Sequence, residues 1–151
     1  MTRAGRSDSY EERFAAEHRR LDAMFEALIA ALRGGAGDTR AAHASFAALR
    51  DAFESHIAQE DRLYYPAVRA LRPAHATAIA GLVEAHEAFR GRLAAIDADF
   101  PHAAASTLEP ALASFVTAFA AHEVAEERLL RALDDELRRA AGAGAPPTPA
   151  T

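Results

Sequence analysis

A histidine followed four residues later by a glutamate occurs twice in the chain, within the segments HIAQEDRLYYP and HEVAEERLL. The two pairs are His56 with Glu60 and His122 with Glu126. Residues four apart in a helix lie on one face, about one turn from each other. Each pair would therefore present an imidazole and a carboxylate in the same direction. Nitrogen and oxygen donors presented together are typical ligands of Fe, Mn or Zn.

Each pair is preceded by one further histidine, which lies in a segment that is also helical in pattern. His18 precedes the first pair and His86 precedes the second, at nearly equal intervals. The repeated unit is thus a pair of helices, of which the first has one histidine and the second has the HxxxE motif.

All six residues lie on helix faces that are otherwise apolar. Large apolar residues recur in four segments at steps of three and four, the spacing of one buried helix face. The histidines and glutamates continue the same series, so the sequence predicts that they are buried. The apolar members of the series are Phe14, Leu21, Phe25, Leu28, Leu32, Phe46, Leu49, Phe53, Leu63, Ile79, Leu82, Phe89, Leu93, Ile96, Leu108, Leu112, Phe115, Phe119, Leu129 and Leu133.

The same periodicity predicts the elements that position these residues, and no segment alternates as a strand would. Helices are expected over about residues 10–32, 39–71, 73–98 and 106–140. Their short connections predict an all-α fold, an up-down-up-down antiparallel four-helix bundle with a metal site in the core. Counted from the helix ends, all four histidines reach one level, about 18 to 26 Å along each helix.

Domain limits follow from the composition at the two ends. We expect a flexible N-terminus over residues 1–8, the bundle over 9–141, and a disordered Pro/Ala-rich tail over 142–151.

Local signals refine the expected helix ends. Capping boxes are predicted for Ser9 with Glu12 and for Ser106 with Glu109. Pro66 lacks a backbone N–H and is expected to kink the second helix.

The cost of burying charge indicates what this polar layer is for. A buried carboxylate without a partner costs several kcal/mol, and no Lys or Arg lies on the four stripes to neutralise one. A cation from outside is therefore required. Six nitrogen and oxygen donors exceed the four that one tetrahedral zinc uses, which favours two metals sharing carboxylates. A lone histidine on an apolar stripe is more often structural, but the duplicated motif with two further histidines at matched heights favours the metal site.

The segments AEHRRL, HIAQEDRLYYP, EAHEAF and HEVAEERLL together resemble the hemerythrin-like, or HHE cation-binding, family over about residues 10–140. That family has His in its first helix, HxxxE in its second, His in its third and HxxxE in its fourth. The resemblance implies two iron ions joined by an oxo or hydroxo bridge, with Mn or Zn as substitutes, and with Glu60 and Glu126 bridging. The implied metal ligands are His18, His56, Glu60, His86, His122 and Glu126.

The chain departs from the similar oxygen-carrying hemerythrins in two ways. Those proteins have five histidines, two of them four apart on the third helix, whereas the four-spaced neighbours of His86 are Leu82 and Arg90. They also place the last carboxylate five residues after its histidine, where this chain has Glu127. The angle around the helix from that histidine is about 40° for Glu126 and about 140° for Glu127. We therefore expect Glu126 to be the ligand, with Glu127 as the alternative, and expect open coordination positions.

Residues beside the ligands are expected to support them. Tyr64, one turn after Glu60, is predicted either to bind at the cofactor through a hydrogen bond from its hydroxyl to a bound oxygen species, or to be a tyrosine at the core edge. Tyr65 is interpreted as structural. Asp61 and Glu127 are expected to orient imidazoles.

Together these residues predict a non-haem di-iron protein that binds O₂, peroxide or NO, for sensing, scavenging or slow peroxide turnover. Whether it is an enzyme stays open. The alternative is an iron-responsive metal-binding module that acts through a separate protein partner. A metal-free helical interaction domain is a third reading.

Composition restricts the partners and the compartment. The net charge of -5 argues against nucleic acid, and the absence of Cys excludes disulfides and thiolate metal sites. Neither a signal peptide nor an apolar run of about 18 residues is visible. We expect a cytoplasmic protein that does not bind membranes, is monomeric or weakly dimeric, and takes a small diatomic or peroxide ligand. The absence of Lys and Asn fits a GC-rich bacterial genome.

Overall fold

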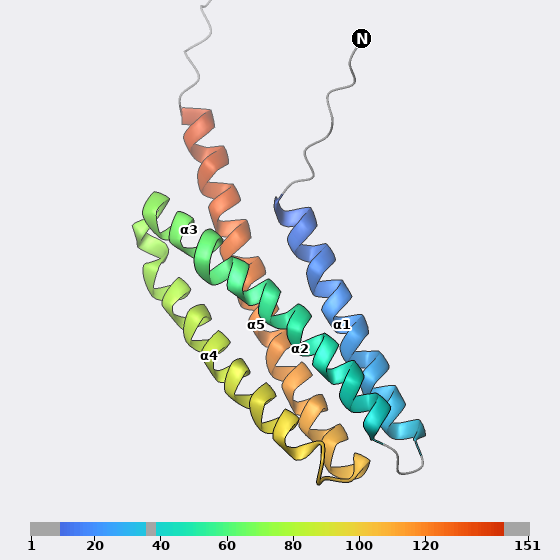
Figure 1. Cartoon of the computed structure of the whole chain (residues 1–151). Coiled ribbons are helices and arrows are strands. Elements are labelled where there is room, and N and C mark those ends of the chain that lie inside the picture. The colour runs from blue at the N-terminus through green and yellow to red at the C-terminus, as the bar shows by residue number, and fades with distance from the viewer. Residues whose placement is uncertain (1–9, 36–38, 144–151) are drawn as a thin grey trace, which may run out of the picture.

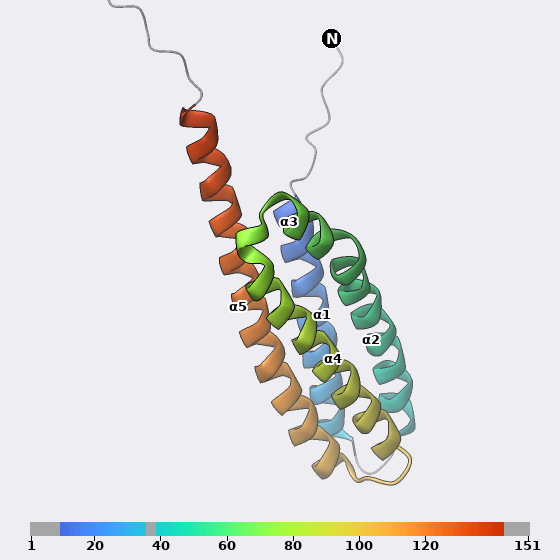
Figure 2. The ribbon, with the colours of Figure 1, turned by 90° about the vertical axis from the view of Figure 1, so that its left-hand side faces the viewer.

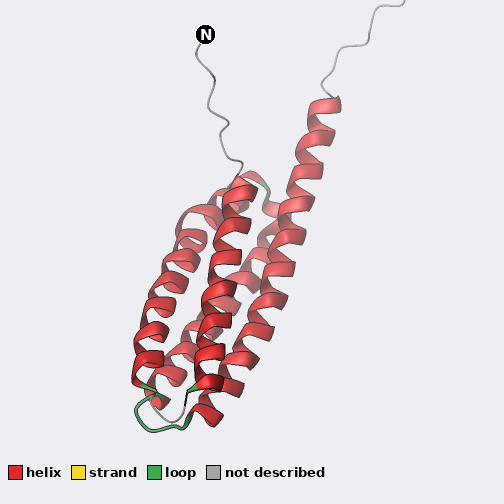
Figure 3. Cartoon of the chain, turned by 90° about the vertical axis from the view of Figure 1, so that its right-hand side faces the viewer, coloured by secondary structure: helices red, strands yellow, loops and turns green. Residues whose placement is uncertain are grey.

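The computed structural model describes residues 10–35 and 39–143, and every regular element in these ranges is helical (Figure 3). No strand occurs in the described part of the chain. The elements are α1 (Tyr10–Gly34), α2 (Arg40–Gln59), the π-helical turn η1 (Glu60–Tyr64), α3 (Tyr65–Leu71), the 3₁₀ turn η2 (Pro73–His75), α4 (Ala76–Asp99) and α5 (Ala105–Ala143).

The long helices lie side by side along the molecule. In Figure 1, α1 ends and α2 begins at the lower end, α3 ends and α4 begins at the upper end, and α4 ends and α5 begins at the lower end again. Helix α1 packs against α2 and α5, and α4 packs against the same two helices. Helix α5 extends past the upper end of the others (Figure 2). Within the described ranges, no helix combines the length and apolar character that crossing a membrane requires.

The core consists of two apolar clusters, separated along the helices by the predicted polar layer. The larger cluster is rich in aromatic rings, among them Phe25, Phe53 and Phe115. The smaller one surrounds Tyr65 and Ile79. This arrangement follows from the stripes, because each stripe is apolar on both sides of its histidine.

The predicted apolar stripes are buried with one clear exception. Leu63 was expected in the core but is 71 % exposed. The reason is η1, in which the N–H of Tyr65 bonds to the carbonyl of Glu60, five residues earlier. Pro66 offers no N–H and its ring clashes with the carbonyl four residues before it, so a wider turn relieves the strain. The predicted kink is thus a π-helical turn, and it brings Tyr65 onto the buried face in place of Leu63.

Several expected helix ends differ from the structure or lie outside it. Ser9 and the N-terminal segment 1–8 are outside the described residues, as is the tail from residue 144. The capping box at Ser106 is wrong, since α5 already begins at Ala105. The carboxylate of Glu109 instead accepts hydrogen bonds from Nε and Nη2 of Arg33, at 3.0 and 2.7 Å.

Candidate metal centre

The six predicted ligand residues come together in mid-bundle and are between 0 and 6 % exposed. They form two groups that could each hold a metal ion, and both groups contain Glu60 and Glu126. Within each group the nitrogen and oxygen donors all lie within 4.8 Å of one another. The first group adds His18 and His56, and the second adds His86 and His122.

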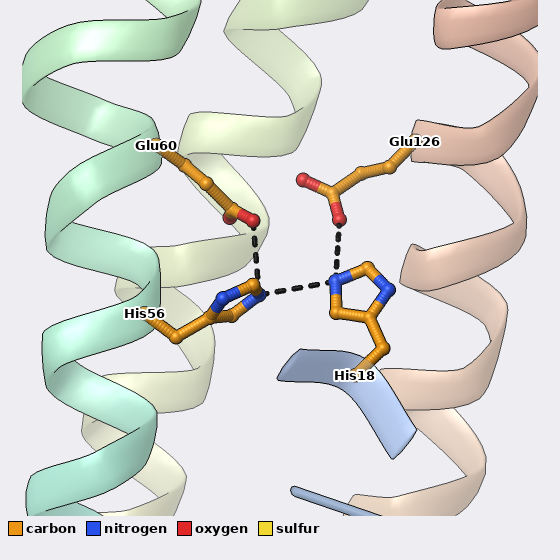
Figure 4. A group of neighbouring side chains, drawn as sticks. All are labelled: His18, His56, Glu60 and Glu126. Atoms are coloured by element: carbon orange, nitrogen blue, oxygen red, sulfur yellow. Dashed lines mark hydrogen bonds and ion pairs between the residues drawn. The ribbon is translucent and has the colours of Figure 1, made fainter. Parts of the chain in front are cut away.

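In the first group, two imidazoles and two carboxylates from three helices point at a common centre (Figure 4). Nε2 of His18 lies 3.0 Å from Nε2 of His56. Nε2 of His56 is 2.9 Å from Oε1 of Glu60, and Nε2 of His18 is 3.4 Å from Oε2 of Glu126.

The second group repeats this geometry with the other oxygen of each carboxylate. Nε2 of His86 lies 3.0 Å from Nε2 of His122. Nε2 of His86 is 3.2 Å from Oε2 of Glu60, and Nε2 of His122 is 3.4 Å from Oε1 of Glu126. Each glutamate therefore gives one oxygen to each group, which is the arrangement that a carboxylate needs in order to bridge two cations.

Two further carboxylates fix the orientation of one imidazole in each group. Nδ1 of His56 lies 2.8 Å from Oε2 of Glu17, and Nδ1 of His86 lies 2.8 Å from Oδ1 of Asp61. A carboxylate beside Nδ1 favours the tautomer with its proton there. The lone pair on Nε2 then faces the centre of the group, as metal ligation requires. The predicted role of Asp61 is confirmed in this geometric sense, whereas Glu17 was missed.

The two orienting carboxylates are held to different degrees. Asp61 accepts a hydrogen bond of 3.1 Å from Arg90, whose guanidinium also binds Glu54 and Glu87. The side chain of Glu17 is 45 % exposed. The second group is therefore supported by a charged network across α2 and α4, and the first group borders solvent.

A buried phenol also contacts the ligands, and it is not the one that the sequence suggested. The hydroxyl of Tyr65 donates a hydrogen bond to Oε1 of Glu126, and Tyr65 is 1 % exposed. Tyr64 is half-buried, with its ring 5.7 Å from that of Phe14. A binding role for Tyr64 stays a prediction. The contact of Tyr65 was missed because a straight helix turns that residue away from the site.

Burial and neighbouring imidazoles shift the two carboxylates in opposite directions. Burial raises the pKa of Glu60 to about 8, although the adjacent imidazole of His86 opposes the rise. Burial also opposes ionisation of Glu126, but the imidazoles of His122 and His18 outweigh it and lower the pKa of that group. The metal-free site thus favours one protonated and one ionised carboxyl group.

Unsatisfied oxygens show that the residues present fit a bound cation. Among the described residues, neither oxygen of Glu60 accepts a hydrogen bond, and neither does Oε2 of Glu126. Imidazole nitrogens nevertheless lie 2.9 and 3.2 Å from the Glu60 oxygens. Buried carboxylate oxygens are rarely left in this state. A cation coordinated by these nitrogens and oxygens would satisfy all of them, and the mixed donor set suits Fe, Mn or Zn.

Two other glutamates of α5, Glu127 and Glu123, lie near the ligand residues in sequence but differ in whether they reach the site. The structure places Glu127 on the surface, 3.3 Å from Arg131, so only Glu126 faces the ligand groups and Glu127 orients no imidazole. Glu123 was missed. Its Oε1 lies 3.9 Å from Nδ1 of His18, and burial raises its pKa to about 7.

Comparison with known proteins gives one result, from protein families. The family described as the hemerythrin HHE cation binding domain matches residues 10–146. Neither the curated proteins nor the solved structures include a significant match.

Proposed function

The chain belongs to the hemerythrin HHE cation-binding domain family, and from this premise we propose that it is a non-haem di-iron protein that binds O₂, peroxide or NO. Its role would be sensing, scavenging or slow peroxide turnover. The observation that supports two metals is the division of each shared carboxylate: Glu60 and Glu126 both give one oxygen to each histidine pair.

In this proposal the protein residues would hold and orient two iron ions. Bound iron would supply redox change and open coordination positions for the small ligand. His18 and His56 would bind one ion and His86 and His122 the other. Tyr65 steadies the shared carboxylate of Glu126 by donating a hydrogen bond to it.

Aromatic rings border both ligand groups. Phe14 has its ring 4.8 Å from that of His18, and Phe89 has its ring 5.3 Å from that of His122. Apolar walls of this kind strengthen the interaction between a cation and its charged ligands, because they lower the local dielectric.

An up-down-up-down antiparallel topology is part of the proposal. It is supported by the turns at alternate ends in Figure 1 and by the level at which the four histidines meet. In this topology the two helix pairs of the repeat would each contribute one histidine pair.

A second candidate is an iron-responsive module that acts through a protein partner. It is favoured by the position of the polar layer between two apolar clusters. Without a cation, that layer opposes close packing, so metal occupancy would control how well ordered the bundle is.

Both candidates can be tested with purified protein reconstituted with ferrous iron. We expect two iron ions per chain by metal analysis, and an optical spectrum that changes when peroxide or NO is added. Fewer than two ions after reconstitution would contradict the di-iron proposal. Two ions with a spectrum insensitive to both ligands would favour the iron-responsive module.

A further inference from the structure

A cavity of about 240 Å³ opens between α1 and α2 beside the first ligand group. Two ligand residues, His56 and Glu60, form part of its wall although both are buried. One water molecule takes about 30 Å³ in the liquid, so the cavity has room for a species of three heavy atoms. Its lining residues are Arg13, Phe14, Glu17, His56, Gln59 and Glu60.

Arg13 is the one cationic side chain in this wall. It forms no ion pair or hydrogen bond with any side chain of residues 12–35 or 39–142, in contrast to Arg90, which binds three carboxylates. The two acidic groups of the wall lie next to imidazoles. Glu17 contacts Nδ1 of His56, and Glu60 faces the ligand groups. Among the described side chains, no carboxylate therefore neutralises the guanidinium of Arg13, which stands at the rim of the cavity.

Two other hollows that reach the ligands, one beside α4 and one between α1 and α5, lack an unpaired cation. The groove of about 600 Å³ between α4 and α5 reaches His122, but alanines dominate its wall and its cation, Arg92, is bound to a serine hydroxyl. The cavity of about 140 Å³ between α1 and α5 reaches His18, and its cation, Arg131, is paired with a glutamate of the same helix.

We propose that the cavity rimmed by Arg13 is the binding route and subsite for small anions, such as a deprotonated peroxide or a triatomic anion, on the His56 side of the centre. This inference rests on the proposed function, because it assumes iron at the first ligand group. An unpaired cation at a rim attracts anions from solution and mainly raises their rate of association. It has no such effect on a neutral diatomic molecule.

The same helix offers a matched control. Arg20 lies two turns after Arg13 and lines the next cavity along the α1–α2 groove, of about 300 Å³. That cavity shares Glu17, His56 and Gln59 with the first but does not reach Glu60. Arg20 likewise has no ion pair within the described part of the chain. Removing either arginine changes the net charge equally, and only one of them borders the proposed subsite.

The test compares azide, as the anionic probe, with NO, as the neutral one, on the iron-loaded full chain. Association rates are measured by stopped-flow absorbance, after metal analysis shows equal iron content in all variants. For Arg13→Gln we expect azide association to slow about three- to tenfold at low ionic strength, with the difference fading at high salt. Its NO rate should equal that of the wild type. Arg13→Lys should keep most of the azide rate, and Arg20→Gln should change it by less than about twofold.

The outcomes separate this inference from the function on which it rests. Equal slowing of azide and NO in Arg13→Gln would overturn it, since the residue would then act on the shape of the route. Equal azide effects in Arg13→Gln and Arg20→Gln would overturn it as well, because general charge would explain them. If the wild type binds both NO and azide, and Arg13→Gln leaves the azide association rate unchanged, the anion subsite is refuted and the proposed function stands. If the iron-loaded wild type binds neither azide nor NO, both the proposed function and the anion subsite are refuted.

Discussion

Glu60 and Glu126 are the residues on which the whole centre depends, because each serves both histidine pairs. The sequence could predict them, since they lie on apolar stripes at a spacing of four from a histidine. It could not predict Glu17 and Asp61 equally well. Their partners are imidazoles on other helices, and a single-helix pattern contains no information on which flanking carboxylate faces across.

Replacement of Glu126 should lower the metal content of the protein, and replacement of Glu127 should leave it unchanged. Glu126→Ala removes one oxygen from each ligand group, so we expect loss of at least one of two metal equivalents by metal analysis. Glu127→Ala is the control, because that side chain is exposed. Its metal content should equal that of the wild type. If Glu127→Ala lost metal and Glu126→Ala kept it, the ligand assignment would have to be reversed.

The two adjacent tyrosines should also differ in their effects. Tyr65→Phe removes the hydroxyl that donates to Glu126 and keeps the ring in its buried place. Loss of a hydrogen bond to a metal ligand typically lowers metal affinity about 10- to 100-fold. We expect a loss in that range, measured by competition with a chelator, and a shifted optical spectrum.

Tyr64→Phe provides the comparison and tests the role that the sequence suggested. If Tyr64 binds at the cofactor, its variant should keep the metal affinity but change the reaction with peroxide. If Tyr64→Phe reacts with peroxide as the wild type does, Tyr64 has only a packing role at the edge of the core.

At the level of elements, the π-helical turn η1 is the feature that sequence periodicity could not supply. Regular steps of three and four located the buried faces of α1, α4 and most of α5, because those helices are continuous through the site. In the second helix the same steps placed Leu63 in the core, and it is exposed. Pro66 signalled an irregularity, but a kink, a break and a wider turn are all physical responses to a missing N–H.

A deletion can test whether η1 acts as a one-residue insertion. Removing Leu63 in a Pro66→Ala background should convert η1 to α-helix without rotating α3, since a π-turn adds one residue. Tyr65 would then stand four residues after Glu60 and keep its contact with Glu126. We expect metal content close to that of Pro66→Ala alone.

Removal of Ser55 in the same background is the matched control. Ser55 is exposed and lies in regular helix, so its loss rotates the preceding part of α2 by about 100° relative to the ligands. This variant should lose metal. Similar metal content in the two deletions would show that η1 is not the place where the helix absorbs a residue.

For the whole molecule, the polar layer divides one core into two apolar clusters, so the bundle is most dependent on metal at its middle. Removing the metal with a chelator should lower the melting temperature. A ligand present at 100 times its dissociation constant stabilises by about 2.7 kcal/mol. For a chain of this size, that corresponds to about 5 to 10 °C. An unchanged melting curve after verified metal removal would contradict a role of the metal in stability.

The metal-free protein should also lose stability as the pH rises from about 5 to about 8. Burial raises the pKa of Glu60 from 4.5 to about 8, so the folded chain keeps a proton that the unfolded chain has released. The stability from this proton is complete below pH 4.5 and is lost as the pH rises through 8. The raised pKa of Glu123, about 7, acts in the same direction. Glu126 has a lowered pKa and contributes in the opposite sense, but only below pH 4.5.

The metal-bound protein should show the reverse trend over the same range. Its ligands must be ionised carboxylates and neutral imidazoles, so protons compete with the metal and acid weakens binding. Melting temperatures of the two forms should therefore diverge between pH 5 and pH 8. Glu60→Gln without metal supplies the control, because an amide cannot titrate, and its melting temperature should depend much less on pH. If the curves of the two wild-type forms ran parallel, the raised pKa of Glu60 would not contribute to stability, and the dependence of the layer on a cation would lose its electrostatic basis.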